Sequence, residues 1–168
     1  SVEGDKIGPR PVNFHIDALV KMGATVEERE DGWYMVAQER LKGALIELPY
    51  PSVMATETIL LASSMAEGRT VIRNAAIEPE IRSMIMMLQK MGAIVELGAG
   101  REIEIIGVEK LHGCTHRVLP DRLEAASFAC MALATRGEIF CEDARHEDLI
   151  TFLNAVRMIG GEYKVEEN

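Results

Sequence analysis

The chain has 168 residues, and its 18 lysine and arginine residues against 27 aspartate and glutamate residues give a formal net charge of −9. Its composition of 48% hydrophobic and 27% charged residues is that of an ordinary globular sequence and excludes intrinsic disorder and a disulfide-stapled miniprotein. The acidic balance argues against general nucleic-acid binding. Because no apolar run reaches the roughly 18 residues of a membrane span and no leader pattern is visible, we expect neither a membrane anchor nor a signal peptide.

Hydrophobic periodicity and turn residues predict alternating helices and strands, which places the chain in the α/β class. In chain order we expect a helix at 13–22, strands at 25–28, 33–37 and 44–48, a helix at 52–66, a strand at 69–73, a helix at 79–91, strands at 93–97 and 102–106, helices at 121–134 and 149–156, and a final strand after Gly160. Ser52 and Asp121 are the expected N-caps of their helices, the second within a capping box that ends at Glu124.

A repeat of about 69 residues runs through the chain and is its most informative feature. Gly23, Gly92 and Gly160 each end a helix and precede a strand, and they lie 69 and 68 residues apart. Gly68 and Gly137 form a second pair with a spacing of 69 residues. Two independent landmarks with one period predict a repeated β-α-β-α-β-β unit.

The repeat predicts one complete unit between two partial ones, all within one domain. The expected parts are a partial first unit at 1–43, a complete unit at 44–116 and a partial third unit at 117–168. A first unit that begins halfway predicts that the chain is a piece of a longer protein. The helices at 53–66 and 123–134 are apolar or small on nearly all sides, so we expect them to be buried together in a common core.

The loop at 4–15 is the first candidate functional segment. Two glycines and two prolines shape it, and Lys6, Arg10 and His15 form a basic cluster in an otherwise acidic chain. Such a cluster favours a phosphate site, and Arg10 between two prolines has a stiff backbone that can aim its side chain. The alternative is a surface turn with scattered charges.

Two further segments carry side chains of the right type for a ligand. Ser52 precedes a helix start, where unpaired N–H groups favour an anion, although a plain N-cap explains the same serine. His112, Cys114 and His116 would share one face of an extended segment and could ligate zinc, but no fourth ligand is evident, so we expect no metal. The odd number and wide spacing of the cysteines favour reduced thiols in a cytoplasm. They are Cys114, Cys130 and Cys141.

Several motifs occur together in a fixed order. They are the loop at 4–15, Arg40-Leu-Lys-Gly-Ala44, Asn74-Ala-Ala-Ile-Glu-Pro-Glu-Ile81, Gly107-Val-Glu-Lys-Leu111 and Arg117-Val-Leu-Pro-Asp-Arg-Leu-Glu124. In these motifs the chain closely resembles the UDP-N-acetylglucosamine 1-carboxyvinyltransferase family. The resemblance runs over all 168 residues but covers less than half of the family's chain. It implies one domain of an inverted α/β prism, in which β-α-β-α-β-β units surround buried helices.

The resemblance also implies a reaction: transfer of enolpyruvate from phosphoenolpyruvate to the 3-hydroxyl of UDP-N-acetylglucosamine, with release of phosphate and without a cofactor. This is the first committed step of peptidoglycan synthesis, so it implies a cytoplasmic enzyme of cell wall biogenesis and cell shape. Asp5 stands where most members have a mobile-loop cysteine that is taken to protonate C3 of phosphoenolpyruvate. An aspartate there implies insensitivity to fosfomycin, which alkylates the thiol. Arg10 matches the arginine that contacts the anionic substrates.

The implied substrate-binding residues fall in two segments. They are Lys6, Pro11, Val12, Asn13, Phe14 and His15 in the first segment, and Ser52, Val53 and Met54 in the second. The chain departs from the family at Asn13, Tyr50 and Met54, where an acid, a lysine and a glycine are usual. A paralogue that uses another sugar nucleotide and a non-catalytic binding or scaffold piece are therefore the alternatives. Because further catalytic groups lie in the rest of the family's chain, we expect the isolated chain to be inactive.

Overall fold

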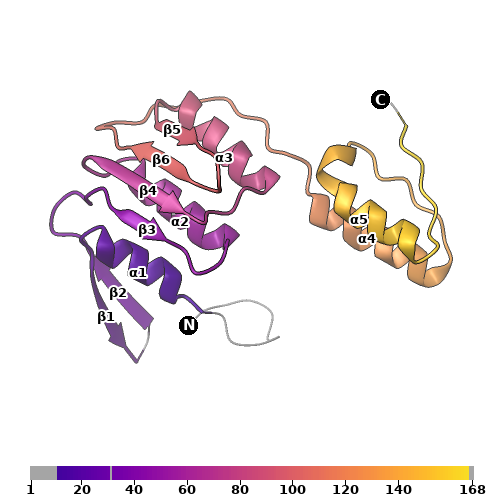
Figure 1. Ribbon diagram of the computed structural model, residues 1–168, viewed down its shortest axis with the longest axis horizontal. Helices are drawn as coiled ribbons and strands as arrows, with labels where there is room; N and C mark the ends of the chain where they lie inside the picture. Colours follow the sequence, from indigo (N-terminus) through magenta and orange to yellow (C-terminus); the bar gives the residue numbers. More distant parts are fainter. Residues whose placement is uncertain (1–10, 31, 167–168) are drawn as a thin grey trace. The chain divides into compact units, whose positions relative to one another are not determined.

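The computed structural model describes residues 11–30 and 32–166, which fall into two compact units that divide after Arg117 (Figure 1). The first unit contains α1 (Asn13–Lys21), β1 (Thr25–Arg29), β2 (Gly32–Val36), β3 (Leu45–Glu47), α2 (Val53–Ser63), β4 (Arg69–Arg73), α3 (Pro79–Lys90), β5 (Ile94–Leu97) and β6 (Ile103–Ile106). The second unit contains α4 (Arg122–Thr135) and α5 (His146–Met158). The mixture of helices and strands confirms the expected α/β class.

A four-stranded sheet with the strand order β3-β4-β6-β5 organises the first unit. β3 and β4 are parallel, with Leu45 opposite Val71, and α2 forms the crossover between them. β6 pairs antiparallel with both β4 and β5, so α3 leads into a β5–β6 hairpin at the edge of the sheet. This order of elements is the β-α-β-α-β-β unit that the sequence predicts. A separate antiparallel hairpin, β1–β2, follows α1.

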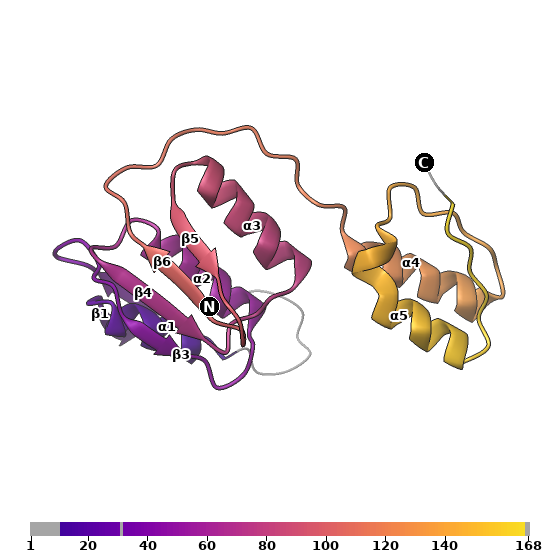
Figure 2. The same cartoon turned by 45° about the horizontal axis from the view of Figure 1, so that its top comes forward.

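The core of the first unit lies between this sheet and the helices that cover one of its faces (Figure 2). Strand alternation turns Ile103 and Ile105 inward and leaves Glu104 on the outer face, where it pairs with Arg69 at 2.5 Å. This ion pair lowers the pKa of Glu104. The largest core residues are Met22, Ile59, Leu60, Ile72, Ile81, Leu88, Ile103 and Ile105.

The prediction that the helix at 53–66 is buried on every side was wrong for part of its surface. Ile59 and Leu60 are fully buried in α2, whereas Leu61 of the same helix is exposed, and so is Met65 just beyond its end. A helix is buried only where a neighbouring element covers it, and α1, α3 and the sheet strands β4 and β6 pack against α2. The matching helix α4 has no buried residue. The expected common core of the two helices concerns the arrangement of the two units and stays a prediction.

The second unit is a pair of packed helices. The carboxylate of Asp121 caps α4 as expected, because its Oδ1 accepts hydrogen bonds from the backbone N–H groups of Leu123 at 2.8 Å and Glu124 at 3.2 Å. The final strand expected after Gly160 was wrong, since residues 161–166 form no strand. A strand needs a neighbour to pair with, and the described part of this unit contains helices and connecting segments but no strand.

Candidate functional site

The two candidate substrate-binding segments lie side by side at the beginnings of α1 and α2. The ring nitrogen Nδ1 of His15 is 2.8 Å from the hydroxyl oxygen Oγ1 of Thr58, which links α1 to α2. The rings of Phe14 and Tyr50 meet edge to face, with their centroids 5.2 Å apart. Segments that are far apart in the chain thus form one surface.

Among the described residues, no side chain of the N-cap position or the first turn neutralises the positive end of the α1 dipole. Its N-cap residue, Val12, has no side-chain acceptor for the first N–H groups, and the first turn contains no acidic residue. The carbonyl of Val12 accepts hydrogen bonds from the N–H groups of His15 and Ile16, both at 3.1 Å. An uncapped first turn of this kind favours a nearby anion.

The beginning of α2 is capped by Ser52, as the sequence predicts. Its hydroxyl accepts a hydrogen bond from the N–H of Ala55 at 3.4 Å, which is long for this type of bond. The backbone around the cap is held more firmly, because Thr56 donates its hydroxyl to the Ser52 carbonyl at 2.7 Å and accepts from the N–H of Ala76 at 3.0 Å. The first turn of α2 also contains no acidic residue. Two helix beginnings that favour anions therefore lie close together.

The remaining candidate side chains differ in what they contact. Phe14 and Val53 are partly buried and pack against the core, so part of their surface serves the fold. Pro11 and Asn13 are exposed, and Met54 is 65% exposed on the first turn of α2. Val12 is half-buried. The exposed members are thus the ones whose side chains are free to meet a ligand.

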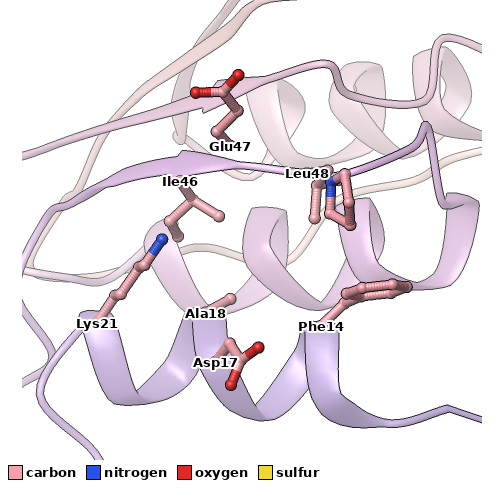
Figure 3. Close-up of a pocket in the computed structure, with 8 residues that line it drawn as sticks. Phe14, Asp17, Ala18, Lys21, Ile46, Glu47 and Leu48 are labelled. Carbon is pink, nitrogen blue, oxygen red and sulfur yellow. The ribbon is translucent and has the colours of Figure 1, made fainter.

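A small pocket opens between α1 and β3 with the residues that follow it (Figure 3). Its volume is about 120 Å³, and its walls include Phe14, Asp17 and Lys21 from α1 and Leu48 from the other side. The carboxylate of Glu47 points away from α1, on the opposite side of its strand. Binding sites for drug-sized ligands occupy roughly 300–1,000 Å³, so this pocket does not enclose a sugar nucleotide.

Three of the sequence-based candidates, Asp5, Lys6 and Arg10, lie outside the described residues. The structure does not bring the side chains of His112, Cys114 and His116 together as a ligand set. His116 Nε2 instead lies 3.0 Å from the Ser83 hydroxyl, and the Cys114 thiol faces the Met87 carbonyl at 3.9 Å. Over residues 11–30 and 32–166 no group of three or more metal-ligating side chains comes close enough to hold an ion.

Thr58 and Tyr50 are the residues of this surface that the candidate set omits. Thr58 is 43 residues from its partner His15, and nothing in the local pattern of either residue predicts the bond. In the sequence, Tyr50 stands out only as a departure from a family pattern. The one available signal is its place between Pro49 and Pro51, which marks a stiff segment before a helix.

Comparisons with known proteins agree on one family. The family model for EPSP synthase (3-phosphoshikimate 1-carboxyvinyltransferase) matches residues 2–168. Two curated relatives, both named UDP-N-acetylglucosamine 1-carboxyvinyltransferase, are similar over nearly the whole chain. The protein of Protochlamydia amoebophila is 48% identical over 98% of this chain and 36% of its own length, and that of Chlamydia muridarum is 47% identical over 98% and 37%. The chain thus spans little more than a third of the length of these relatives.

Solved structures show the same fold. The enolpyruvyl transferase NikO from Streptomyces tendae matches 95% of this chain and 41% of its own, with a TM-score of 0.79 and 21% sequence identity. The EPSP synthase of Acinetobacter baumannii matches 71% of this chain and 27% of its own, with a TM-score of 0.58 and 30% identity. Both likenesses support the expected prism-type domain, and at 21% identity the first speaks for the fold alone.

Proposed function

Because this chain belongs to the EPSP synthase family, we propose that the full-length protein transfers the enolpyruvyl group of phosphoenolpyruvate to the 3-hydroxyl of UDP-N-acetylglucosamine. The observation that carries the proposal is the identity of 44–48% over at least 98% of the chain to relatives named for this activity. The match to a solved EPSP synthase is weaker and covers 71% of the chain. This difference favours a sugar nucleotide over a shikimate derivative as the acceptor.

The proposed reaction is an addition followed by an elimination. The 3-hydroxyl loses its proton to solvent as its oxygen bonds to C2 of phosphoenolpyruvate, while C3 gains a proton from the protein, which gives a tetrahedral intermediate. C3 then loses a proton and the bond from C2 to the phosphate oxygen breaks, which releases inorganic phosphate. In this proposal Asp5 donates the proton to C3, and Arg10 and Lys6 neutralise the phosphate and carboxylate of the substrates.

The described residues support the binding half of this proposal. The neighbouring first turns of α1 and α2 favour the negative charge of a diphosphate, next to Ser52 and Val53. Pro11, Val12 and Asn13 would line the nucleotide from the other segment. His15 has its Nδ1 occupied by Thr58, so Nε2 is the ring atom left to face a substrate. Because catalysis also needs the cleft to close over both substrates, the isolated chain is expected to be inactive.

The proposed reaction also implies a cellular role and location. A carboxyvinyl transfer to UDP-N-acetylglucosamine places the protein at the start of peptidoglycan synthesis, in the cytoplasm, where it contributes to cell wall biogenesis and cell shape. In the described part of the chain, none of the helices combines the length and the apolar character needed to cross a membrane. The acceptor remains the point on which the alternatives differ: a paralogue would use another sugar nucleotide, and a scaffold would use none.

Phosphate release by the full-length protein tests the proposal. With phosphoenolpyruvate and UDP-N-acetylglucosamine we expect turnover. Arg10→Ala should lower kcat/KM by roughly 100-fold or more, because the positive charge that neutralises the anionic groups of the substrates is lost. Arg82→Ala, on the exposed face of α3, is the matched control and should leave turnover unchanged. Turnover only with another sugar nucleotide would establish the paralogue, and no turnover with any would establish the scaffold.

The role of Asp5 has its own experiment. The wild-type protein should keep its activity after incubation with fosfomycin, whereas Asp5→Cys should be active and become inactivated, because only the thiol can be alkylated. Asp5→Asn cannot donate a proton and should lose turnover while it still binds UDP-N-acetylglucosamine. Full turnover by Asp5→Asn would contradict the assigned proton transfer.

A further inference from the structure

The exposed ring of Tyr50 lies beside the beginnings of α1 and α2. Tyr50 is 50% exposed, although its ring meets the ring of Phe14 at a centroid distance of 5.2 Å and an angle of 85° between the planes. Phe14 is itself partly buried against the core of the first unit. The core therefore holds the ring of Phe14, and Phe14 in turn holds the ring of Tyr50, which keeps half of its surface exposed to solvent.

The backbone of Tyr50 is restrained on both sides. Pro49 precedes it and Pro51 follows it, and proline restricts both its own φ and the conformation of the residue before it. The carbonyl of Tyr50 also accepts a hydrogen bond from the N–H of Ser52 at 2.8 Å. Little conformational freedom is left to lose when a ligand covers the ring, so binding there costs less entropy than at a free side chain.

The position of the Tyr50 ring relative to the beginnings of α1 and α2 indicates which class of ligand could bind there. Tyr50 precedes the cap residue Ser52 by two positions, so the two lie at most roughly 7 Å apart along the chain. A ribose spans a distance of this order between a base and its 5′-phosphates. A flat ring next to two helix beginnings that favour anions thus offers both partners that a nucleotide needs: a stacking surface and a phosphate-binding end.

We propose that Tyr50, supported by Phe14, is the stacking platform for the base of the nucleotide substrate and so determines how strongly that substrate binds. This inference rests on the proposed function, in which the acceptor is a sugar nucleotide. Stacking on an aromatic face tolerates any base, because every base has a π-face, so Tyr50 contributes affinity for a nucleotide and leaves the choice of base to other groups. Tyr50 takes no part in proton transfer.

Three ligands, two variants of Tyr50 and one control variant of the full-length protein test the platform. Tyr50→Ala should raise the KM for UDP-N-acetylglucosamine and the inhibition constant of uridine monophosphate by about 5- to 100-fold, the range that base stacking supplies. The inhibition constant of N-acetylglucosamine 1-phosphate, which has no base, should not change, and neither should kcat. Tyr50→Phe keeps the ring and should behave as the wild type. Tyr34→Ala removes a similarly exposed tyrosine from the β1–β2 hairpin and is the matched control.

Thermal melting of each variant separates binding from folding, since a loss of the edge-to-face contact also affects stability. If Tyr50→Ala weakened the binding of the base-free sugar phosphate as much as that of uridine monophosphate, the platform would be overturned. Wild-type constants for Tyr50→Ala would overturn it as well. Absence of phosphate release by the wild type would overturn the proposed function instead. In that case calorimetry with uridine monophosphate decides the platform alone: equal binding by the wild type and Tyr50→Ala, or binding by neither, would overturn it.

Discussion

The two units of the chain use similar helices in different surroundings. α2 and α4 correspond in the repeat and share a composition of alanine, methionine and aliphatic residues. In the first unit α2 packs against α1, α3 and the sheet, and it buries Ile59 and Leu60 completely. In the second unit α4 packs on α5, and Val156 is the one buried residue among those described there. Apolar composition thus makes a helix capable of burial, whereas the neighbouring elements decide how much of it is buried.

Truncation of apolar side chains should show the difference in burial between α2 and α4 most clearly. Ile59→Ala removes a fully buried side chain and should destabilise the 168-residue chain by about 2–5 kcal/mol, through lost burial and the cavity that remains. Met131→Ala in α4 removes a side chain that is 53% exposed and should change stability by less than about 0.5 kcal/mol. Denaturant unfolding followed by circular dichroism measures both. A similar cost at the two positions would show that α4 is as well packed as α2.

A close backbone contact gives a second test of the tight packing in the first unit. A Cβ atom on Gly107 would lie 1.7 Å from the carbonyl oxygen of Ala66, so Gly107→Ala requires the backbone to move. We expect a loss of about 1–3 kcal/mol, as for other overpacked sites. Gly113→Ala is the control, because a Cβ there meets no atom within 4 Å. Equal melting temperatures of the two variants would contradict the close contact.

Removal of the helix caps should have a smaller effect on stability, and it again compares α4 with α2. Asp121→Ala should lower stability by about 0.5–2 kcal/mol and reduce the helix content of the second unit, because two N–H groups of α4 lose their acceptor. Ser52→Ala should fall at the low end of that range, since its one cap bond is 3.4 Å long. Far-UV circular dichroism and hydrogen exchange of the first turns distinguish the two, and Asp121→Asn, which keeps an acceptor, should retain the native helix content.

The smallest expected effect lies on the outer face of the sheet and depends on pH. Arg69 lowers the pKa of Glu104 in the folded chain, so the unfolded chain binds the proton more readily. The stabilisation is therefore present above the ordinary glutamate pKa of 4.5 and is lost as the pH falls through the lower folded value. Glu104→Gln should unfold at lower denaturant than the wild type at neutral pH, and the difference should disappear in acid. A difference that is independent of pH would contradict this ion pair.

The sequence predicts the parts of this structure that depend on local patterns. The bounds of the strand at Arg69–Arg73 and the start of α3 at Pro79 agree with the prediction, and so do the caps at Ser52 and Asp121. These features arise from alternation, from proline at a first helical position and from side chains that accept N–H groups within the next turn.

The remaining features depend on contacts between distant segments, which local patterns do not contain. The final strand expected after Gly160 fails because its formation depends on a pairing partner and not on its own residues. The bond between His15 and Thr58 and the pairing of Phe14 with Tyr50 arise from the packing of α1 on α2. Part of the candidate site could therefore be named from the sequence, but not the way in which its two segments meet.

The decisive test of the proposed transfer is calorimetric titration of UDP-N-acetylglucosamine into the full-length protein, with and without phosphoenolpyruvate. We expect saturable binding of the sugar nucleotide in a one-to-one ratio, followed by phosphate release once phosphoenolpyruvate is present. Binding of other sugar nucleotides but not of this one would contradict the proposed acceptor and make Asn13 and Met54, which depart from the family pattern, the first residues to test for a different specificity. Absence of binding by any sugar nucleotide would contradict the proposed function and leave only the fold.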